Sequence, residues 1–190
     1  YSMITQISVY NDFVAIADAC VAGGSESRMQ KTDAGGIDEN FVGFSLVDYL
    51  GISGNDLNGI TVGDGNTSAD GLTIENNTIG LNDAVNATLP NGTDNSTSGG
   101  LVCNRSTNTG SGNTTTVSGN TIAGNAGQGM WITENCFDWD ILDNYVGTNF
   151  NYATGLGNNF DGVQVKSNPA DNFEEVEVVE NIIGNNTNDG

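Results

Sequence analysis

The chain of 190 residues contains 24 acidic residues, 4 basic residues and no histidine, which gives a formal net charge of −20. Such a surface repels phosphate groups, so we expect no nucleic-acid partner and no binding to anionic membranes. No apolar run approaches the roughly 20 residues that span a bilayer, so we also expect no membrane insertion.

Residues 1–54 are predicted to form an N-terminal segment that lies outside the repeats that follow. The stretch from Ile7 to Val21 is apolar enough to be ordered. Because a solenoid needs its end covered, a cap is one interpretation of this segment. An arm that adds a strand to a neighbouring molecule is the other. Residues 22–36 are typical of a flexible connector.

Residues 55–190 contain two short motifs that alternate four times. The first is a glycine, an apolar residue, any residue, and an apolar residue or cysteine, beginning at Gly59, Gly100, Gly129 and Gly162. The second is a ten-residue window that aligns without gaps at 73–82, 116–125, 140–149 and 177–186. Glycine and asparagine, both frequent here, tolerate left-handed backbone, which favours short strands and tight turns. A repeat of this size indicates an all-β solenoid.

Each window carries asparagine in two fixed columns. The first column is Asn77, Asn120, Asn144 and Asn181, and the second is Asn82, Asn125, Asn149 and Asn186. In coils stacked about 4.8 Å apart, the same asparagine recurs above itself, and its amide donates to one neighbour and accepts from the other. We therefore predict a structural asparagine ladder at the first column. The alternative is that these residues only form turns in a β-sandwich.

The stretch NYVGTNFNYATGLGNNFDGVQV, at 144–165, is similar to the repeat units of bacterial secreted and surface β-helix proteins. Those units pair an Asn-x-Ile-Gly-Thr-Asp/Asn element with a later Gly-Asn-x-x-Asp-Gly-Val/Ile element. Residues 55–190 thus resemble right-handed parallel β-helix proteins of the pectate-lyase-like superfamily. The resemblance implies a right-handed parallel β-helix of about four coils. It does not imply an activity, because this fold hosts many functions.

Two polar, turn-rich insertions, at 83–99 and 104–116, interrupt the repeat and are predicted to be surface loops. Acceptor sequences for N-glycosylation lie mostly in or beside them, where a glycan is easily accommodated. The candidate sites are Asn66, Asn76, Asn86, Asn91, Asn95, Asn104, Asn113 and Asn185.

The acidic residues Asp138, Asp140 and Asp143 lie close together in the sequence and are calcium candidates. Calcium binds several oxygen ligands and tolerates loose geometry. The alternative is a solvated acidic face that prevents edge pairing, and no Asp-x-Asp-x-Asp-Gly loop is present. We expect no cofactor and no metal, with calcium at these three residues as the exception.

We expect no enzymatic activity. The polysaccharide lyases of the superfamily that the chain resembles use an arginine or lysine base together with acidic calcium ligands. Arg28 and Lys31 lie in the connector, and Arg105 lies in a polar loop. Lys166 alone follows a core strand, so a lyase with Lys166 as its base is the alternative.

The three cysteines, Cys20, Cys103 and Cys136, leave two interpretations open. In a secreted protein, an odd count indicates one disulfide and one free or intermolecular thiol. Three reduced, buried thiols are equally compatible with the sequence.

Together these patterns predict an extracellular or cell-surface structural glycoprotein, a subunit of a filament or adhesin. Gly190 stands where a fifth glycine strand would begin, so further chain or a second copy is expected to cover the last coil. Head-to-tail docking of copies is heterologous and builds fibres, so the chain itself is the expected partner, with glycans as a further one. The alternative is a carbohydrate-active β-helix, either a polysaccharide lyase or a spike-type glycan binder.

Overall fold

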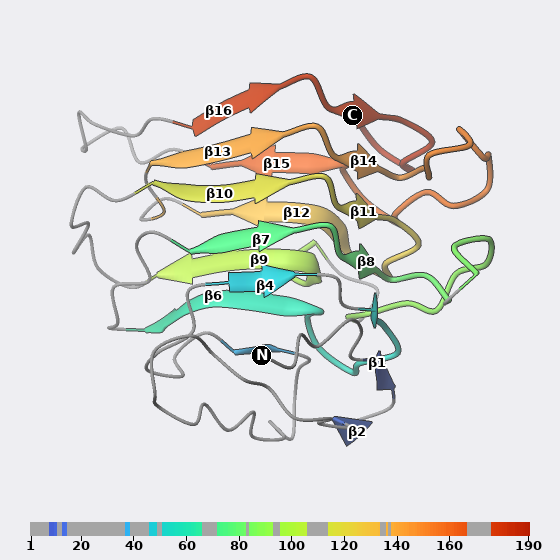
Figure 1. The fold of residues 1–190 in the computed structure, drawn as a ribbon, viewed down its shortest axis with the longest axis horizontal. Helices are drawn as coiled ribbons and strands as arrows, with labels where there is room; N and C mark the ends of the chain where they lie inside the picture. The colour runs from blue at the N-terminus through green and yellow to red at the C-terminus, as the bar shows by residue number, and fades with distance from the viewer. Residues whose placement is uncertain are drawn as a thin grey trace, which may run out of the picture.

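The computed structural model describes residues 51–65, 72–82, 84–92, 96–105, 114–133, 136, 138–166 and 176–190, and the backbone of four short strands before residue 51. These residues form strands β1 to β17 and contain no helix. The strands are arranged in three sheets that run along one stack of coils (Figure 1). The prediction of an all-β parallel β-helix is confirmed.

We number the sheets by the order in which each turn of the chain meets them. Sheet 1 contains β3 (Ile37–Asp38), β6 (Ile60–Gly65), β9 (Gly99–Arg105), β12 (Gln128–Ile132) and β15 (Val163–Val165). Sheet 2 contains β4 (Leu46–Asp48), β7 (Thr73–Glu75), β10 (Thr115–Ser118), β13 (Trp139–Leu142) and β16 (Val176–Val179). Sheet 3 contains β1 (Ser8–Tyr10), β2 (Phe13–Val14), β5 (Gly51–Ile52), β8 (Thr78–Ile79), β11 (Thr121–Ile122), β14 (Tyr145–Val146) and β17 (Ile182–Ile183).

One coil is one strand from each sheet. Coil 1 is β3–β4–β5, coil 2 is β6–β7–β8, coil 3 is β9–β10–β11, coil 4 is β12–β13–β14 and coil 5 is β15–β16–β17. Each strand pairs in parallel with the same strand of the next coil, as β10 does with β13. The chain therefore climbs one layer with every three strands, which is the arrangement of a solenoid.

Coil 1 lies within residues 1–54, the range predicted to form a cap or arm. Its strands extend all three sheets in parallel, and β1 adds one more parallel strand to sheet 3 before β2 turns back against it. Coil 1 has Tyr49 and Leu50, rather than an asparagine, between its sheet 2 and sheet 3 strands, so the repeat motif did not include it. The organisation of the rest of residues 1–54 stays a prediction.

The core consists of side chains that lie above one another in register. The inward row of sheet 3 is Ile52, Ile79, Ile122, Val146 and Ile183. Sheets 1 and 2 contribute similar rows, such as Ile74, Val117 and Ile141 on sheet 2. In the inner coils these side chains are fully buried. Burial of each one stabilises the fold by about 1.5–3 kcal/mol relative to exposure, so the strands need only two to four residues.

The corner between sheets 2 and 3 is a two-residue turn with a fixed backbone pattern. Its first residue has a positive φ in four coils: 55° at Asn76, 64° at Gly119, 56° at Asp143 and 57° at Glu180. Its second residue is the asparagine of the first column. Because left-handed backbone is unfavourable for most side chains, this corner explains the preference for asparagine, aspartate or glycine there.

Candidate functional site

The first asparagine column forms a continuous hydrogen-bonded ladder through coils 2 to 5. Side-chain Nδ2 donates to Oδ1 of the next coil from Asn77 to Asn120 (2.9 Å), from Asn120 to Asn144 (2.9 Å) and from Asn144 to Asn181 (2.8 Å). The same Oδ1 atoms accept from the preceding backbone, as from Asn77 N to Asn120 at 2.9 Å. The structure thus places the four predicted residues one above another, and the ladder satisfies buried polar groups inside an apolar stack.

A second ladder lies at the corner between sheets 3 and 1. It runs from Asn55 to Asn91 (2.7 Å), to Asn125 (3.0 Å), to Asn158 (2.9 Å) and to Asn186 (2.9 Å), each through Nδ2 and Oδ1. The second column of the sequence alignment contains Asn125 and Asn186 but not the other members. Asn91 and Asn158 replace Asn82 and Asn149 because nine residues are inserted at this corner in coils 2 and 4.

The strand glycines lie against this second ladder. A Cβ added to Gly129 would meet the carbonyl of Gly162, and would lie 2.8 Å from Nδ2 of Asn158 and 2.8 Å from Cγ1 of Val146. Gly59, Gly100 and Gly162 face the ladder amides of Asn91, Asn125 and Asn186 in the same way. The glycine motif therefore leaves room for the asparagine ladder.

Replacing Gly129 with alanine is expected to lower the free energy of unfolding by about 1–3 kcal/mol, because the methyl group overpacks a backbone contact. Urea denaturation would measure the loss. Gly184→Ala is the matched control, since a Cβ at Gly184 would meet no atom within 4 Å. Equal costs for the two substitutions would contradict this role of Gly129.

The described glycosylation candidates fall into two groups. Asn76, Asn86 and Asn185 are exposed, which fits a glycan acceptor. Asn91 is 0 % exposed, and its Nδ2 donates to the Ile52 carbonyl at 2.8 Å and to Asn125. A glycan on that nitrogen would break the second ladder, so the prediction for Asn91 is wrong for the folded chain.

The remaining candidates cannot be placed in the same detail. Asn104 belongs to β9. Asn66, Asn95 and Asn113 lie outside the described residues. Whether any of these acceptor sequences carries a glycan stays a prediction.

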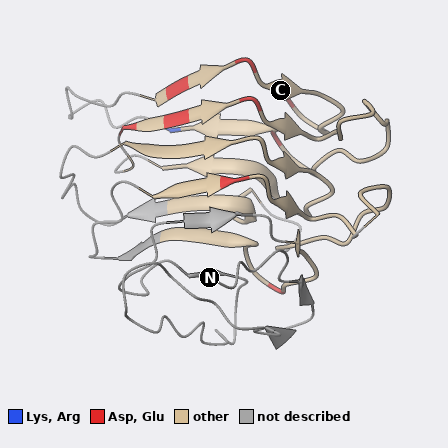
Figure 2. Cartoon of the chain, in the orientation of Figure 1, with Lys and Arg blue, Asp and Glu red and all other residues tan. Residues whose placement is uncertain are grey.

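The calcium candidates do not converge. Asp140 lies within β13, beside Glu177 of β16, whereas Asp138 precedes β13 and Asp143 forms the left-handed corner after it. Figure 2 shows acidic residues on β13 and β16, spread along the strands. Among the described residues, no three Asp, Glu, Cys or His side chains gather closely enough to hold a metal ion.

The residues of the lyase alternative are dispersed as well. Lys166 is exposed and directly follows β15, where its backbone N–H donates to the carbonyl of Ile132 at 2.8 Å. Trp131 is half-buried on the outer face of sheet 1, and Trp139 is fully buried in the core. Arg105 ends β9, and Arg28 and Lys31 lie outside the described residues.

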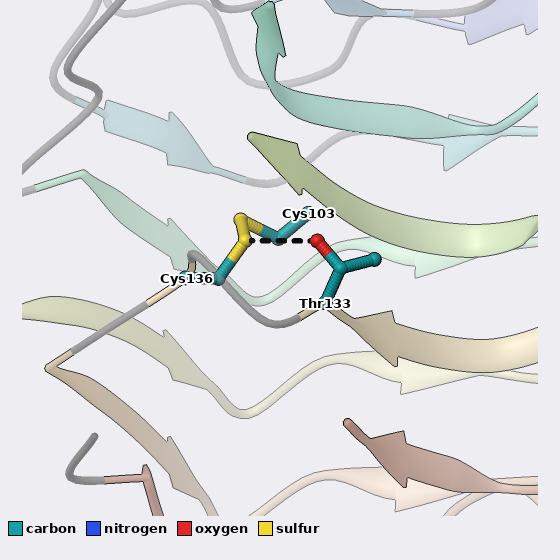
Figure 3. Close-up of a disulfide and its surroundings, with 3 residues drawn as sticks. All are labelled: Cys103, Thr133 and Cys136. Carbon is teal, nitrogen blue, oxygen red and sulfur yellow. Dashed lines mark hydrogen bonds between the residues drawn. A yellow bond between two sulfur atoms is a disulfide. The ribbon is translucent and has the colours of Figure 1, made fainter. Parts of the chain in front are cut away.

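Cys103 and Cys136 form a disulfide that ties β9 to the segment after β12 (Figure 3). Both are buried, and Cys103 continues an inward row between Val62 and Ile132. The sequence left the state of the cysteines open, and the structure shows one disulfide. Cys20 lies outside the described residues.

Coil 5 forms an open end of the stack. Within the described chain, β15, β16 and β17 each pair with coil 4 on one side and are the edge strands of their sheets. The inward side chains Val165 and Val178 are 45 % and 44 % exposed, whereas Ile132 and Ile141 at the same positions of coil 4 are 0 % exposed. Unpaired strand edges and exposed apolar side chains are unfavourable in water and are usually covered.

No family model matches the chain, and no curated protein and no solved structure matches it. The described residues contain no helix with the length and hydrophobicity that a membrane crossing requires. The open end of coil 5 is the largest surface for which the described residues offer no partner, and it is therefore the candidate functional site.

Proposed function

We propose that the protein is a non-enzymatic structural β-helix, a subunit of an extracellular or cell-surface filament or adhesin that is joined end to end. The observation that supports this most directly is the open coil 5. Another β-coil stacked there would bury Val165 and Val178 and would pair three edge strands at once. Such a joint would repeat the contact that already connects every pair of neighbouring coils.

The ladders give this joint a direction. Each asparagine donates toward the next coil, and in the described chain no Oδ1 atom faces the backbone N–H groups of Asn181 and Asn186. At the other end of the second ladder, Oδ1 of Asn55 is buried and accepts no hydrogen bond. Two open ends facing each other would set donors against donors, whereas a stack in one direction pairs donors with acceptors.

We therefore propose that the next coil belongs to a second copy, stacked head to tail. At the far end of the stack, β3 and β4 are the edge strands of sheets 1 and 2, so both sheets can continue across the joint as parallel sheets. In sheet 3 the edge strand there is β2, which would meet β17 in the antiparallel sense. A heterologous contact of this kind does not close on itself and builds a fibre.

The compartment and the finer fold assignment belong to the same proposal. A disulfide such as Cys103–Cys136 is typical of proteins in oxidising, extracellular environments. The exposed residues Asn76, Asn86 and Asn185 would be the glycan acceptors. The repeat motif at 144–165 supports membership of the pectate-lyase-like superfamily of right-handed β-helices.

Sedimentation velocity tests the assembly. We expect species well above the monomer mass of 19.7 kDa, which grow with concentration. Substitution of Val165 and Val178 with lysine is expected to leave a monomer, because charges on the open end prevent edge pairing. Thr114→Lys adds the same charge to an exposed position in the middle of the stack and is expected to leave assembly unchanged. A native chain that stays monomeric at all concentrations would contradict the proposal.

A second candidate function is glycan binding. The observation that favours it is a pair of exposed aromatic residues, Phe150 (59 %) and Tyr152 (63 %), on the insertion of coil 4. Aromatic rings exposed in this way offer an apolar face on which a sugar ring can stack. A polysaccharide lyase with Lys166 as base is the enzymatic form of this alternative, and incubation with acidic polysaccharides and calcium would reveal it by unsaturated products.

A further inference from the structure

The turn that follows each sheet 3 strand has two forms, which alternate along the stack. Coils 1, 3 and 5 have a bare turn, at Ser53–Asn55, Ala123–Asn125 and Gly184–Asn186, whereas coils 2 and 4 carry an insertion that ends at Asn91 and Asn158. The left-handed residue decides the form. It follows the strand directly at Gly80 (φ 91°) and Gly147 (φ 77°), and it comes one residue later at Gly54, Gly124 and Asn185 (φ 74°, 70° and 61°).

The two insertions have the same local conformation. Val85 and Tyr152 occupy equivalent positions, with φ of 54° and 58°. The backbone N–H of each donates to the carbonyl of the first asparagine of its insertion, Asn82 or Asn149, at 2.8 Å in both cases. Figure 1 shows both loops, after β8 and after β14, projecting from the same edge of the stack. The insertion is therefore a repeated module rather than an irregular loop.

Two successive insertions enclose the bare turn that lies between them. Leu81 and Leu156, from either side, form a small buried cluster with Ala123 of coil 3. The N–H of Gly124 donates to the carbonyl of Leu156 at 2.8 Å. Nδ2 of Asn149 reaches across coil 3 to the carbonyl of Val85 at 2.7 Å. Coils 2 to 4 are thus joined by contacts that skip one coil.

The bare turn of coil 5 is enclosed on one side only. In coil 1, the N–H of Gly54 donates to the carbonyl of Leu89 in the following insertion at 3.1 Å, as Gly124 does to Leu156. No described residue accepts from the equivalent N–H of Asn185, and none donates to the carbonyl of Tyr152, which corresponds to that of Val85. Gly184, in the position of Ala123, faces open space.

We infer that the coil that docks on coil 5 carries an insertion of this type after its sheet 3 strand. The inference rests on the proposed end-to-end function and specifies the partner surface: a coil with the pattern Gly-x-Asn, six further residues, and Leu-x-Asn. Its leucine carbonyl accepts from Asn185, its first asparagine donates to Tyr152, and its leucine side chain covers Gly184. These contacts continue the interface that already joins coils 3 and 4.

A fused sixth coil measures this local fit without requiring assembly. A second copy of residues 130–162, with Cys136→Ser, is appended after Gly190, because Gly190 and Gly129 occupy equivalent positions before a sheet 1 strand. The matched fusion lacks residues 149–157 of the added coil and carries Gly147→Ala and Thr148→Gly there, which restores a bare turn. The two fusions have the same strands and differ only in the insertion.

The insertion-bearing fusion is expected to melt about 5 °C above the bare fusion, and to slow amide hydrogen exchange at Asn185 at least about tenfold. Asn149→Ala in the added coil should remove part of this gain. A bare fusion that is equally stable and equally protected at Asn185 would overturn the inference. A chain that stays monomeric while the difference between the fusions persists would instead contradict only the proposed function.

Discussion

Replacement of Asn120 with alanine is expected to lower the free energy of unfolding by about 3–5 kcal/mol. Asn120 lies in the middle of the first ladder and is fully buried. Its Oδ1 accepts from both the backbone and the side chain of Asn77, and its Nδ2 donates to Asn144 and to the carbonyl of Ile74 at 2.9 Å. The substitution leaves two buried donors of Asn77 without an acceptor, and unsatisfied buried groups cost more than the hydrogen bonds themselves contribute.

Urea denaturation followed by circular dichroism would measure this loss. Asn181→Ala removes the ladder residue of the partly exposed coil 5, where water can replace the lost partner, so about 1–2 kcal/mol is expected there. Asn159→Ala changes an exposed asparagine outside both ladders and should be close to neutral. The structural role of the ladder would be contradicted if Asn120→Ala cost no more than Asn159→Ala.

Removal of the disulfide by the double substitution Cys103→Ala and Cys136→Ala is expected to cost about 3–4 kcal/mol. The bond links residues 33 positions apart, and the cross-link restricts the unfolded chain. Because both sulfur atoms are buried within the core, the substitution also loses some packing. Thermal and urea denaturation of the variant and the native chain would measure the difference.

Reductant provides the control for this prediction. The native chain should lose stability when reduced and should then approach the double variant, whereas the variant should not respond to the reductant. A native chain whose stability is the same with and without reductant would show that the cross-link between coils 3 and 4 does not contribute.

The sequence was sufficient to predict the fold and the first ladder, because the corner between sheets 2 and 3 has the same length in coils 2 to 5. Asn77 and Asn144 therefore fall in one column of an ungapped alignment. The second ladder was predicted only in part. An insertion moves the ladder position from Asn149 to Asn158, and the signal that marks the true position is an asparagine four residues before a strand glycine, as in Asn158 and Gly162.

Other features depend on spatial contacts that a linear pattern does not encode. The burial of Asn91 follows from its neighbours Asn55 and Asn125, whereas its local sequence resembles any glycosylation site in a polar loop. The pairing of Cys103 with Cys136 depends on how coils 3 and 4 are stacked. The exposure of Val178 is visible only once β16 is known to be an edge strand.

The alternation of bare and inserted turns also constrains how proteins built in this way can change in length. Duplication of one coil would bring two loops into the space that Ala123 fills, and loss of one coil would leave two bare turns in contact with no leucine between them. Gain or loss of two adjacent coils preserves every neighbour. Length variants that arise by recombination within such a gene should therefore differ by pairs of coils rather than by single ones.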